Sequence, residues 1–153
     1  MNFALDGLLP HTGKMRLVDE VLSFEGETVT LRLVVRDDGL FNDPRLGGDI
    51  AAHVGIEYMA QAVAAHIGLS LQRDGDVKRT GFLLGTRLYE SNVNSFKPGT
   101  ELLLTAERLF ISPEGLGVYD CTIDGPGVRV TAKINGFLPK DDETFWSTVA
   151  GDQ

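Results

Sequence analysis

The sequence predicts an α+β fold in which an antiparallel sheet of about six strands wraps around one long central helix. Residues 51–68 are apolar and rich in alanine, as in a buried helix, whereas the segments on either side alternate as strands do. One helix cannot cover both faces of a six-stranded sheet, so a sheet that curls around the helix is the natural arrangement. We expect a single domain over residues 1–140, followed by a polar tail over residues 141–153.

Strand character appears both before and after the helix. The predicted strands span residues 14–24, 28–36, 80–91, 100–111, 116–124 and 127–138. In the second strand, Val29, Leu31 and Leu33 alternate with mostly polar residues, which is the pattern of a strand with one buried face. Gly26 separates the first two strands. Proline and glycine interrupt the later ones at residues 96–99, 112–115 and 124–127, as expected for antiparallel connections.

The helix is expected to run from about Ile50 to Gln72, with Asp49 as its N-cap. A start at Ala51 or Ala52 is the alternative. The preceding loop is rich in Gly, Pro, Asn and Asp and delivers the chain to the helix. Small residues crowd the helix at Ala60, Ala62, Ala64, Ala65 and Gly68. Their size suits a helix that a sheet packs against closely.

The chain is acidic, with a formal net charge of -8. This charge argues against a nucleic-acid-binding protein, which needs clustered Lys and Arg, and against docking on anionic membranes. The N-terminal residues do not have the pattern of a secretion signal, and polar side chains within the helix argue against a membrane span. We therefore expect a cytoplasmic protein. The single cysteine, Cys121, excludes an internal disulfide and is interpreted as a small strand residue.

The N-terminal half of the helix carries a polar stripe. His53, Glu57 and Gln61 are spaced four residues apart and therefore share one helix face. A carboxylate in a buried helix is costly unless it is paired or has a chemical role. Glutamate and histidine are both common general acids and bases, so the stripe predicts a site of proton transfer.

Two interpretations of this segment stay open. In the first, backbone N–H groups at Gly47 and Gly48, before the helix, hold the carbonyl oxygen of a thioester or ester while Glu57 moves a proton. In the second, which carries equal weight, Glu57 is structural and accepts hydrogen bonds from Arg87 or from a backbone amide.

The other histidines are interpreted conservatively. His66 is taken as a packed or surface residue, and His11 as a residue of the turn that follows Pro10. Neither has the spacing of a metal ligand, and the sequence shows no phosphate-binding or dinucleotide-binding fingerprint. No metal and no cofactor are expected.

Three stretches resemble the 3-hydroxyacyl-acyl-carrier-protein dehydratases of the hot-dog fold superfamily. They are Leu9-Pro10-His11 with residues 15–22 (MRLVDEVL), Glu57-Tyr58-Met59-Ala60-Gln61, and residues 81–85 (GFLLG). Within this superfamily the chain is most similar to the ApeP-type dehydratase-like proteins of aryl polyene synthesis. The resemblance implies a hot-dog fold and a dehydratase that acts on 3-hydroxyacyl thioesters of acyl carrier protein.

The resemblance also implies a dimer whose two sites lie at the subunit interface, each with a histidine from one subunit and the helix carboxylate from the other. Glu57 matches that carboxylate. The position of the family histidine, fourteen residues earlier, is occupied by Asp43, so His53 is the expected replacement. The further substrate contacts are expected at Gln61, Gly48, Ala52 and Tyr58.

Two alternative functions remain beside the dehydratase. One is a hot-dog thioesterase, which also uses an acidic residue on the central helix. The other is a non-catalytic subunit that completes a heteromeric dehydratase, as the absence of the family histidine suggests. The expected partners are therefore an acyl carrier protein and either a second copy of the chain or another hot-dog subunit.

An acidic carrier protein would need a local basic patch on this acidic chain. The candidates for such a patch are Arg73, Lys78, Arg79 and Arg87. Ordinary solvated surface charge is the other interpretation of these four residues.

Overall fold

The computed structural model describes residues 3–77, 79 and 81–139. Its helical elements are α1 (Leu5–Leu8), η1 (Gly13–Met15), η2 (Pro44–Leu46), η3 (Ala52–Val54) and the long helix α2 (Gly55–Arg73), where η marks a single 3-10 turn. Its strands are β1 (Glu20–Glu25), β2 (Thr28–Val34), β3 (Ile50–Ala51), β4 (Phe82–Ser91), β5 (Ser95–Phe96), β6 (Glu101–Ile111), β7 (Leu116–Gly125) and β8 (Val128–Phe137).

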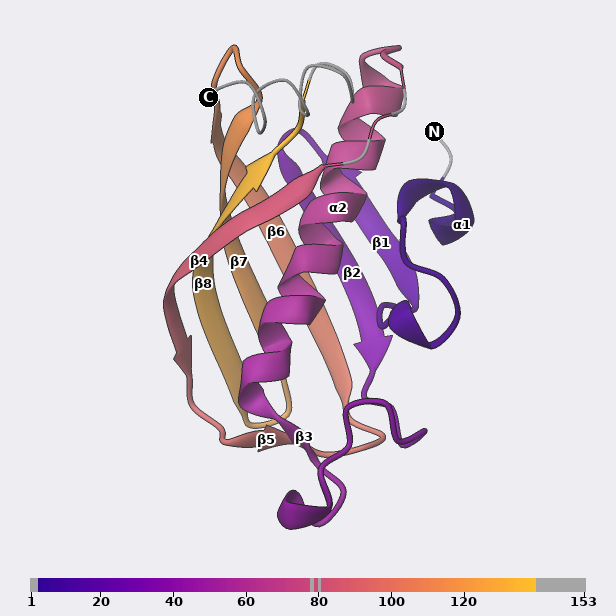
Figure 1. Ribbon diagram of the computed structural model, residues 1–153, viewed down its shortest axis with the longest axis vertical. Helices are drawn as coiled ribbons and strands as arrows, with labels where there is room; N and C mark the ends of the chain where they lie inside the picture. The colour runs from indigo at the N-terminus through magenta and orange to yellow at the C-terminus, as the bar shows by residue number, and fades with distance from the viewer. Residues whose placement is uncertain (1–2, 78, 80, 140–153) are drawn as a thin grey trace, which may run out of the picture.

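Six of the strands form one antiparallel sheet in the order β1-β2-β6-β7-β8-β4. Figure 1 shows this sheet curving around α2, which lies along its concave face. The chain leaves β2 near one edge, passes through α2 and enters the sheet again at the opposite edge as β4. The fold class predicted from the sequence is therefore confirmed, and β1 and β4 are the two edge strands.

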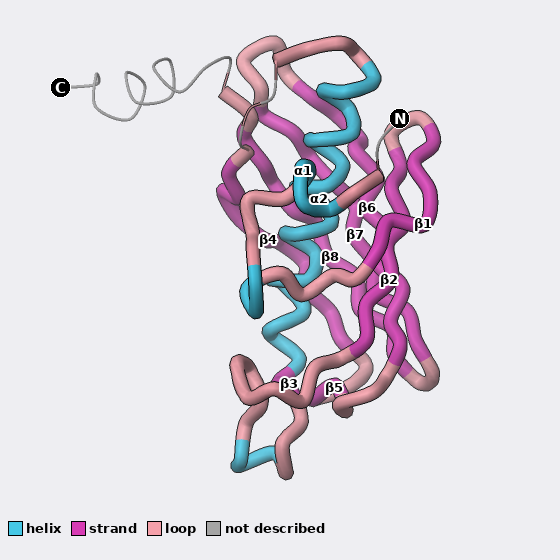
Figure 2. Tube along the Cα trace, turned by 90° about the vertical axis from the view of Figure 1, so that its right-hand side faces the viewer, coloured by secondary structure: helices cyan, strands magenta, loops and turns pink. Residues whose placement is uncertain are grey.

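The core lies between the inner face of the sheet and α2. The alternation predicted for β2 is confirmed, because Val29, Leu31 and Leu33 are at most 1% exposed. On the helix side, Ala62 and Ala65 are equally buried, and their small side chains allow the backbone of α2 to approach the sheet. The N-terminal segment lies on the other side of the helix, where α1 crosses in front of α2 in Figure 2.

The helix begins at Gly55, not at Ile50 as predicted. Ile50 is instead paired with Phe96 in the small two-stranded sheet formed by β3 and β5. Asp49 does not cap the helix, because its carboxylate accepts a hydrogen bond of 2.9 Å from the Ser95 hydroxyl. These tertiary contacts hold the residues before η3 in an extended conformation.

The first strand is also shorter than predicted, since β1 begins at Glu20 rather than at residue 14. Residues 13–15 form the turn η1, and the backbone that follows is bound to a side chain of α2 rather than to a neighbouring strand. The predicted tail, residues 141–153, lies outside the described residues. No helix among the described residues is long and apolar enough to cross a membrane.

His66 is completely buried in the core, which confirms its interpretation as a packed residue. Its Nδ1 atom lies 3.0 Å from the Tyr119 hydroxyl and 3.4 Å from the Ser70 hydroxyl. The ring also contacts Phe24 edge to face. Burial, helped by the positive charge of Arg108, lowers the pKa of His66 to about 4. The folded protein therefore holds this imidazole in its neutral form.

We expect His66 to make the protein less stable in mild acid. Between pH 6.5 and pH 4 the unfolded chain binds a proton at this residue and the folded chain does not, so the free energy of unfolding falls as the pH falls. From pH 7.5 to pH 5 the loss from this group is about 2 kcal/mol. Urea unfolding of the wild type and of His66→Gln at both pH values measures it. Equal losses in the two proteins would contradict the prediction.

Candidate functional site

Glu57 lies in the first turn of α2, and its side chain is exposed. The sequence-based expectation that this carboxylate is buried is therefore wrong for the isolated chain. The expected structural partner is absent as well, because no salt bridge among the described residues joins Glu57 to Arg87 or to any other cation. The carboxylate is thus open to a substrate or to a second subunit.

The turn η3, which carries His53, is fixed by contacts from distant parts of the chain. The Ala52 N–H donates a 3.0 Å hydrogen bond to the Asn94 carbonyl, and the Ala52 carbonyl accepts a short hydrogen bond from the Tyr89 hydroxyl. A Cβ atom at Gly55 would collide with that hydroxyl, so a larger residue at the start of α2 would displace the Tyr89 side chain from Ala52. The histidine therefore sits on a rigid support.

Tyr89 reaches this turn because β4 contains a bulge. The register between β4 and β8 shifts between Arg87 and Glu90, and Leu88 within the bulge has a positive φ of 56°. Positive φ is uncommon for leucine, and bulges often redirect a side chain next to a functional site. Burial raises the pKa of Tyr89 to about 12, so its hydroxyl keeps the proton that it donates to Ala52.

His53 is exposed, as Glu57 is, and it lies close to the position that the resemblance assigns to the family histidine. That position is Asp43, whose carboxylate pairs with Arg45 at 3.0 Å. The hydrogen bonds from Arg45 hold the pKa of Asp43 below its usual range, and the nearby charge of His53 acts in the same direction. The structure therefore brings His53 near Asp43, but it leaves the role of His53 as a prediction.

The glycines before the helix do not offer free N–H groups, contrary to expectation. The Gly47 N–H donates to the Pro44 carbonyl at 3.2 Å, and the Gly48 N–H donates to the Asp43 carbonyl at 3.0 Å. Both therefore stabilise their own loop. No described side chain caps η3 or α2, so the backbone at the start of the helix is the better place for a carbonyl oxygen.

Gln61 and Tyr58 have internal partners as well. Gln61 is 1% exposed, and its amide oxygen accepts hydrogen bonds from the Leu17 and Val18 N–H groups at 2.8 and 3.3 Å. Its amide nitrogen donates to the Met15 carbonyl at 2.6 Å. Tyr58 is also 1% exposed and packs on an aromatic ring of the core. Gln61 thus binds the N-terminal segment, and substrate contact by these two residues stays a prediction.

His11 lies near the candidate site, although the sequence interpretation took it only as a turn residue. It is half-buried, and the Glu57 carboxylate is close enough to raise the pKa of its imidazole, although burial lowers that pKa by more. The signal that could have revealed it is the Leu9-Pro10-His11 motif, which was interpreted as a turn. The structure therefore places the His11 imidazole near Glu57 of the same chain.

The proposed basic patch is not available as expected. Arg73 pairs with Asp74 and Glu27, and Arg79 pairs with Asp76. Lys78 lies outside the described residues. The described cations of this patch are therefore largely neutralised on the surface, with the exception of the exposed Arg87.

Two other kinds of chemistry find little support among the described residues. Cys121 is buried in β7, and burial raises the pKa of its thiol to about 12, so it is not a reactive nucleophile. Across residues 3–77, 79 and 81–139, no group of three or more His, Cys, Asp or Glu side chains is arranged to hold a metal ion.

Comparison with known families decides the classification of the chain. The model of the ApeP-like family, described as ApeP dehydratase, matches residues 3–147. The chain belongs to the ApeP-like family. This ApeP-like chain is 30% identical to the 3-hydroxyacyl-[acyl-carrier-protein] dehydratase FabZ of Chlamydia trachomatis over 144 residues, which cover 90% of the chain and 92% of the relative. FabZ of Chlamydia caviae is 32% identical over 114 residues, 71% of each protein.

Solved structures agree with the family. The ApeP-like chain superimposes on a chain of the dehydratase heterocomplex ApeI:P from Xenorhabdus doucetiae with a TM-score of 0.85 and 25% identity, covering 98% of this chain and 99% of the other. A thioesterase from Staphylococcus aureus gives a TM-score of 0.59 at 16% identity, over 78% and 91% of the two chains. The similarity to the thioesterase shows only that the two chains share a fold. The protein is a hot-dog dehydratase of the ApeP-like family.

Proposed function

We propose that this ApeP-like chain eliminates water from 3-hydroxyacyl thioesters carried by an acyl carrier protein in the cytoplasm. The observation that carries the proposal is the exposed Glu57 carboxylate at the start of α2, in a chain whose FabZ relatives are dehydratases of such thioesters. His53 lies four residues earlier, in the turn η3 that leads into α2, and its side chain is also exposed. These two residues are the proposed acid and base.

The chemistry needs two proton transfers and a site for negative charge. One residue of the pair takes a proton from C2 of the acyl group, and the other delivers a proton to the hydroxyl group on C3. The C3–O bond breaks, the C2–C3 double bond forms, and water leaves. The backbone N–H groups of His53 and Val54 in η3, which no described side chain caps, stabilise the charge that develops on the thioester oxygen.

The partner that completes this site is proposed to be a second hot-dog subunit, which joins at β4. This edge strand is long, and it exposes Leu83, Leu84 and Leu88, of which Leu88 is 69% exposed. Unpaired edges with apolar side chains favour pairing with another chain. Tyr89 of the same strand contacts η3, so a subunit added at β4 lies next to His53.

A different subunit is favoured over a second copy of the chain. Asp43 replaces the family histidine and is already paired with Arg45, so a homodimer would lack that histidine in both of its sites. The similarity to a chain of the ApeI:P heterocomplex supports the same choice. The partner would then supply the wall of the cleft that faces Glu57 and His53, the proposed acid and base of this chain.

The assay that tests the function follows enoyl thioester formation from 3-hydroxyacyl-carrier protein by mass spectrometry, with this chain alone and with an added hot-dog dehydratase subunit. Elimination of water without loss of the acyl group supports the proposal. Release of a free thiol in its place would identify a thioesterase. The molar mass of the complex in solution, measured with and without the partner, distinguishes a homodimer from a heterodimer.

His53→Ala is expected to lower kcat for dehydration about 100-fold, because a general acid or base contributes at least that factor. The side chain is exposed, so the melting temperature should change little. Single-turnover rates with the carrier-bound substrate measure the effect. A variant that keeps the wild-type rate would assign the imidazole role to another residue or to the partner subunit.

A further inference from the structure

The N-terminal segment is attached to the exposed side of α2 at two points. At the C-terminal half of the helix, a Cβ atom on Gly68 would lie 3.2 Å from the Leu8 carbonyl oxygen, so the two backbones are in close contact. Nearer its start, Gln61 binds the backbone of Met15 and of Leu17. The two attachment points are seven residues apart on the helix, which is about 10 Å.

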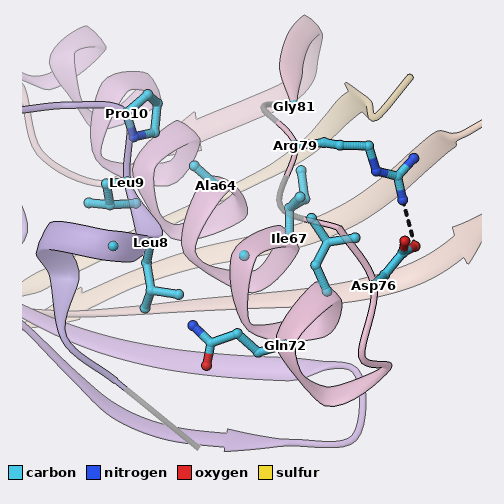
Figure 3. Close-up of a pocket in the computed structure, with 12 residues that line it drawn as sticks. Leu8, Leu9, Pro10, Ala64, Ile67, Gln72, Asp76, Arg79 and Gly81 are labelled. Carbon is cyan, nitrogen blue, oxygen red and sulfur yellow. Dashed lines mark hydrogen bonds and ion pairs between the residues drawn. The ribbon is translucent and has the colours of Figure 1, made fainter. Parts of the chain in front are cut away.

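Figure 3 shows the contact between the N-terminal segment and the C-terminal half of α2. Leu8 and Leu9 lie beside Ala64 and Ile67 of the helix, around a small apolar cavity of about 180 Å³. The ion pair between Arg79 and Asp76 lies at the rim of the cavity. Leu8 and Leu9 are themselves at most 6% exposed, so this part of the segment is firmly packed.

His11 lies between the two attachment points. It follows the buried residue Leu9 and precedes Met15, whose carbonyl binds Gln61, so the backbone is held on both sides of it. Its Nδ1 atom is buried and has no hydrogen-bond partner among the described residues. Leaving a buried polar nitrogen unpaired is costly, and such atoms in native proteins usually have a reason.

Glu57 is the charged group that affects the pKa of the His11 imidazole. Burial lowers the pKa of His11, and the Glu57 carboxylate acts against that effect by favouring the protonated ring. Glu57 is exposed and has no salt bridge with a described residue, so it is free to turn toward the ring. A half-buried imidazole and an exposed carboxylate of one chain thus form a neighbouring pair.

We propose that His11 is a positioning residue that acts through Glu57: a ring N–H of His11 orients the carboxylate for proton transfer once the cleft is closed by substrate and partner subunit. This inference rests on the proposed function and deepens it, because it adds to the same site a residue that the resemblance does not assign. Gln61 and Gly68 contribute indirectly, since they hold the segment that carries His11.

The first test does not depend on catalysis. NMR titration of the imidazole signals, assigned with His11→Asn, gives the pKa of His11 in the wild type and in Glu57→Gln. Removal of the carboxylate is expected to lower this pKa, because the favourable interaction with the protonated ring is lost. Glu114→Gln, which removes an exposed carboxylate far along the sequence in the turn between β6 and β7, should leave it unchanged. Equal pKa values in the wild type and Glu57→Gln would overturn the pairing.

The second test separates positioning from simple support of the fold. His11→Ala is expected to lower kcat about 10- to 100-fold with little change in KM, because misorientation of a catalytic group has effects of that size. His11→Asn, whose side-chain nitrogen can take the place of Nδ1, should recover part of the loss. Unchanged kcat in both variants, with an active wild type, would overturn the inference.

The proposed function can fail separately from this inference. A wild-type chain that forms no enoyl thioester, alone or with its partner, would contradict the dehydratase proposal. The titration would still decide whether His11 and Glu57 interact.

Discussion

Glu57→Gln is expected to reduce the rate of dehydration by at least about 100-fold, the contribution of a well-placed general acid or base. Glutamine has nearly the same shape as glutamate, but it neither accepts nor delivers a proton at neutral pH. The side chain is exposed in the isolated chain and forms no salt bridge with a described cation. The free energy of unfolding should therefore change by less than about 0.5 kcal/mol.

The measurement compares kcat for carrier-bound 3-hydroxyacyl substrates in the presence of the partner subunit. Glu114→Gln is the matched control, since it makes the same chemical change at an exposed carboxylate between β6 and β7. It should behave as the wild type. If both Glu57→Gln and Glu114→Gln retain full activity, Glu57 is not the acid or base. The chain would then act as a supporting subunit.

Gln61→Leu is expected to lower the free energy of unfolding by about 3 kcal/mol, the cost of leaving several buried polar groups unpaired. The amide of Gln61 satisfies the N–H groups of Leu17 and Val18 and the carbonyl of Met15. Leucine fills a similar volume and offers none of these bonds. Within the described part of the chain, no strand pairs with the segment before β1 until Asp19, whose N–H donates to the Arg32 carbonyl.

Urea unfolding measures the loss, and hydrogen exchange locates it. The amide hydrogens of Leu17 and Val18 should be protected in the wild type and exchange rapidly in the variant. Gln72→Leu makes the same change at an exposed position of the same helix, far from Leu17 and Val18, and should leave the protection of these two amides unchanged. Continued protection of Leu17 and Val18 in Gln61→Leu would show that other contacts hold the segment.

Most of the sheet could be predicted from local patterns. The alternation in β2 identifies a strand with one buried face, and the proline and glycine pairs mark the ends of β6, β7 and β8. The long apolar segment identifies the central helix. These features depend on interactions between near neighbours in sequence, so the order of side chains alone contains them.

The start of the helix could not be predicted in this way. Ile50 looks like the first residue of α2, but it pairs with Phe96, and the expected cap Asp49 binds Ser95. Both partners lie more than forty residues further along the chain. No local pattern shows that a two-residue strand forms there in preference to another turn of helix.

The same limit applies to the candidate site. Glu57 and Gln61 are polar residues one helical turn apart in a segment that is otherwise apolar. Local sequence patterns therefore predict the same burial for both side chains. In the structure Glu57 is exposed and Gln61 is completely buried, because the N-terminal segment covers the helix at Gln61. That segment also brings His11, more than forty residues away in sequence, to Glu57.

The sequence by itself determined the fold class, the central helix and the polar stripe that contains Glu57, because periodicity and motif are properties of neighbouring residues. Only the tertiary structure decided which polar side chains of α2 are structural and which are open to substrate. That decision depends on the elements that pack over each turn of the helix, namely the N-terminal segment at Gln61 and Tyr89 of β4 at the start of the helix. Glu57 lies outside both contacts, and so it remains exposed for chemistry.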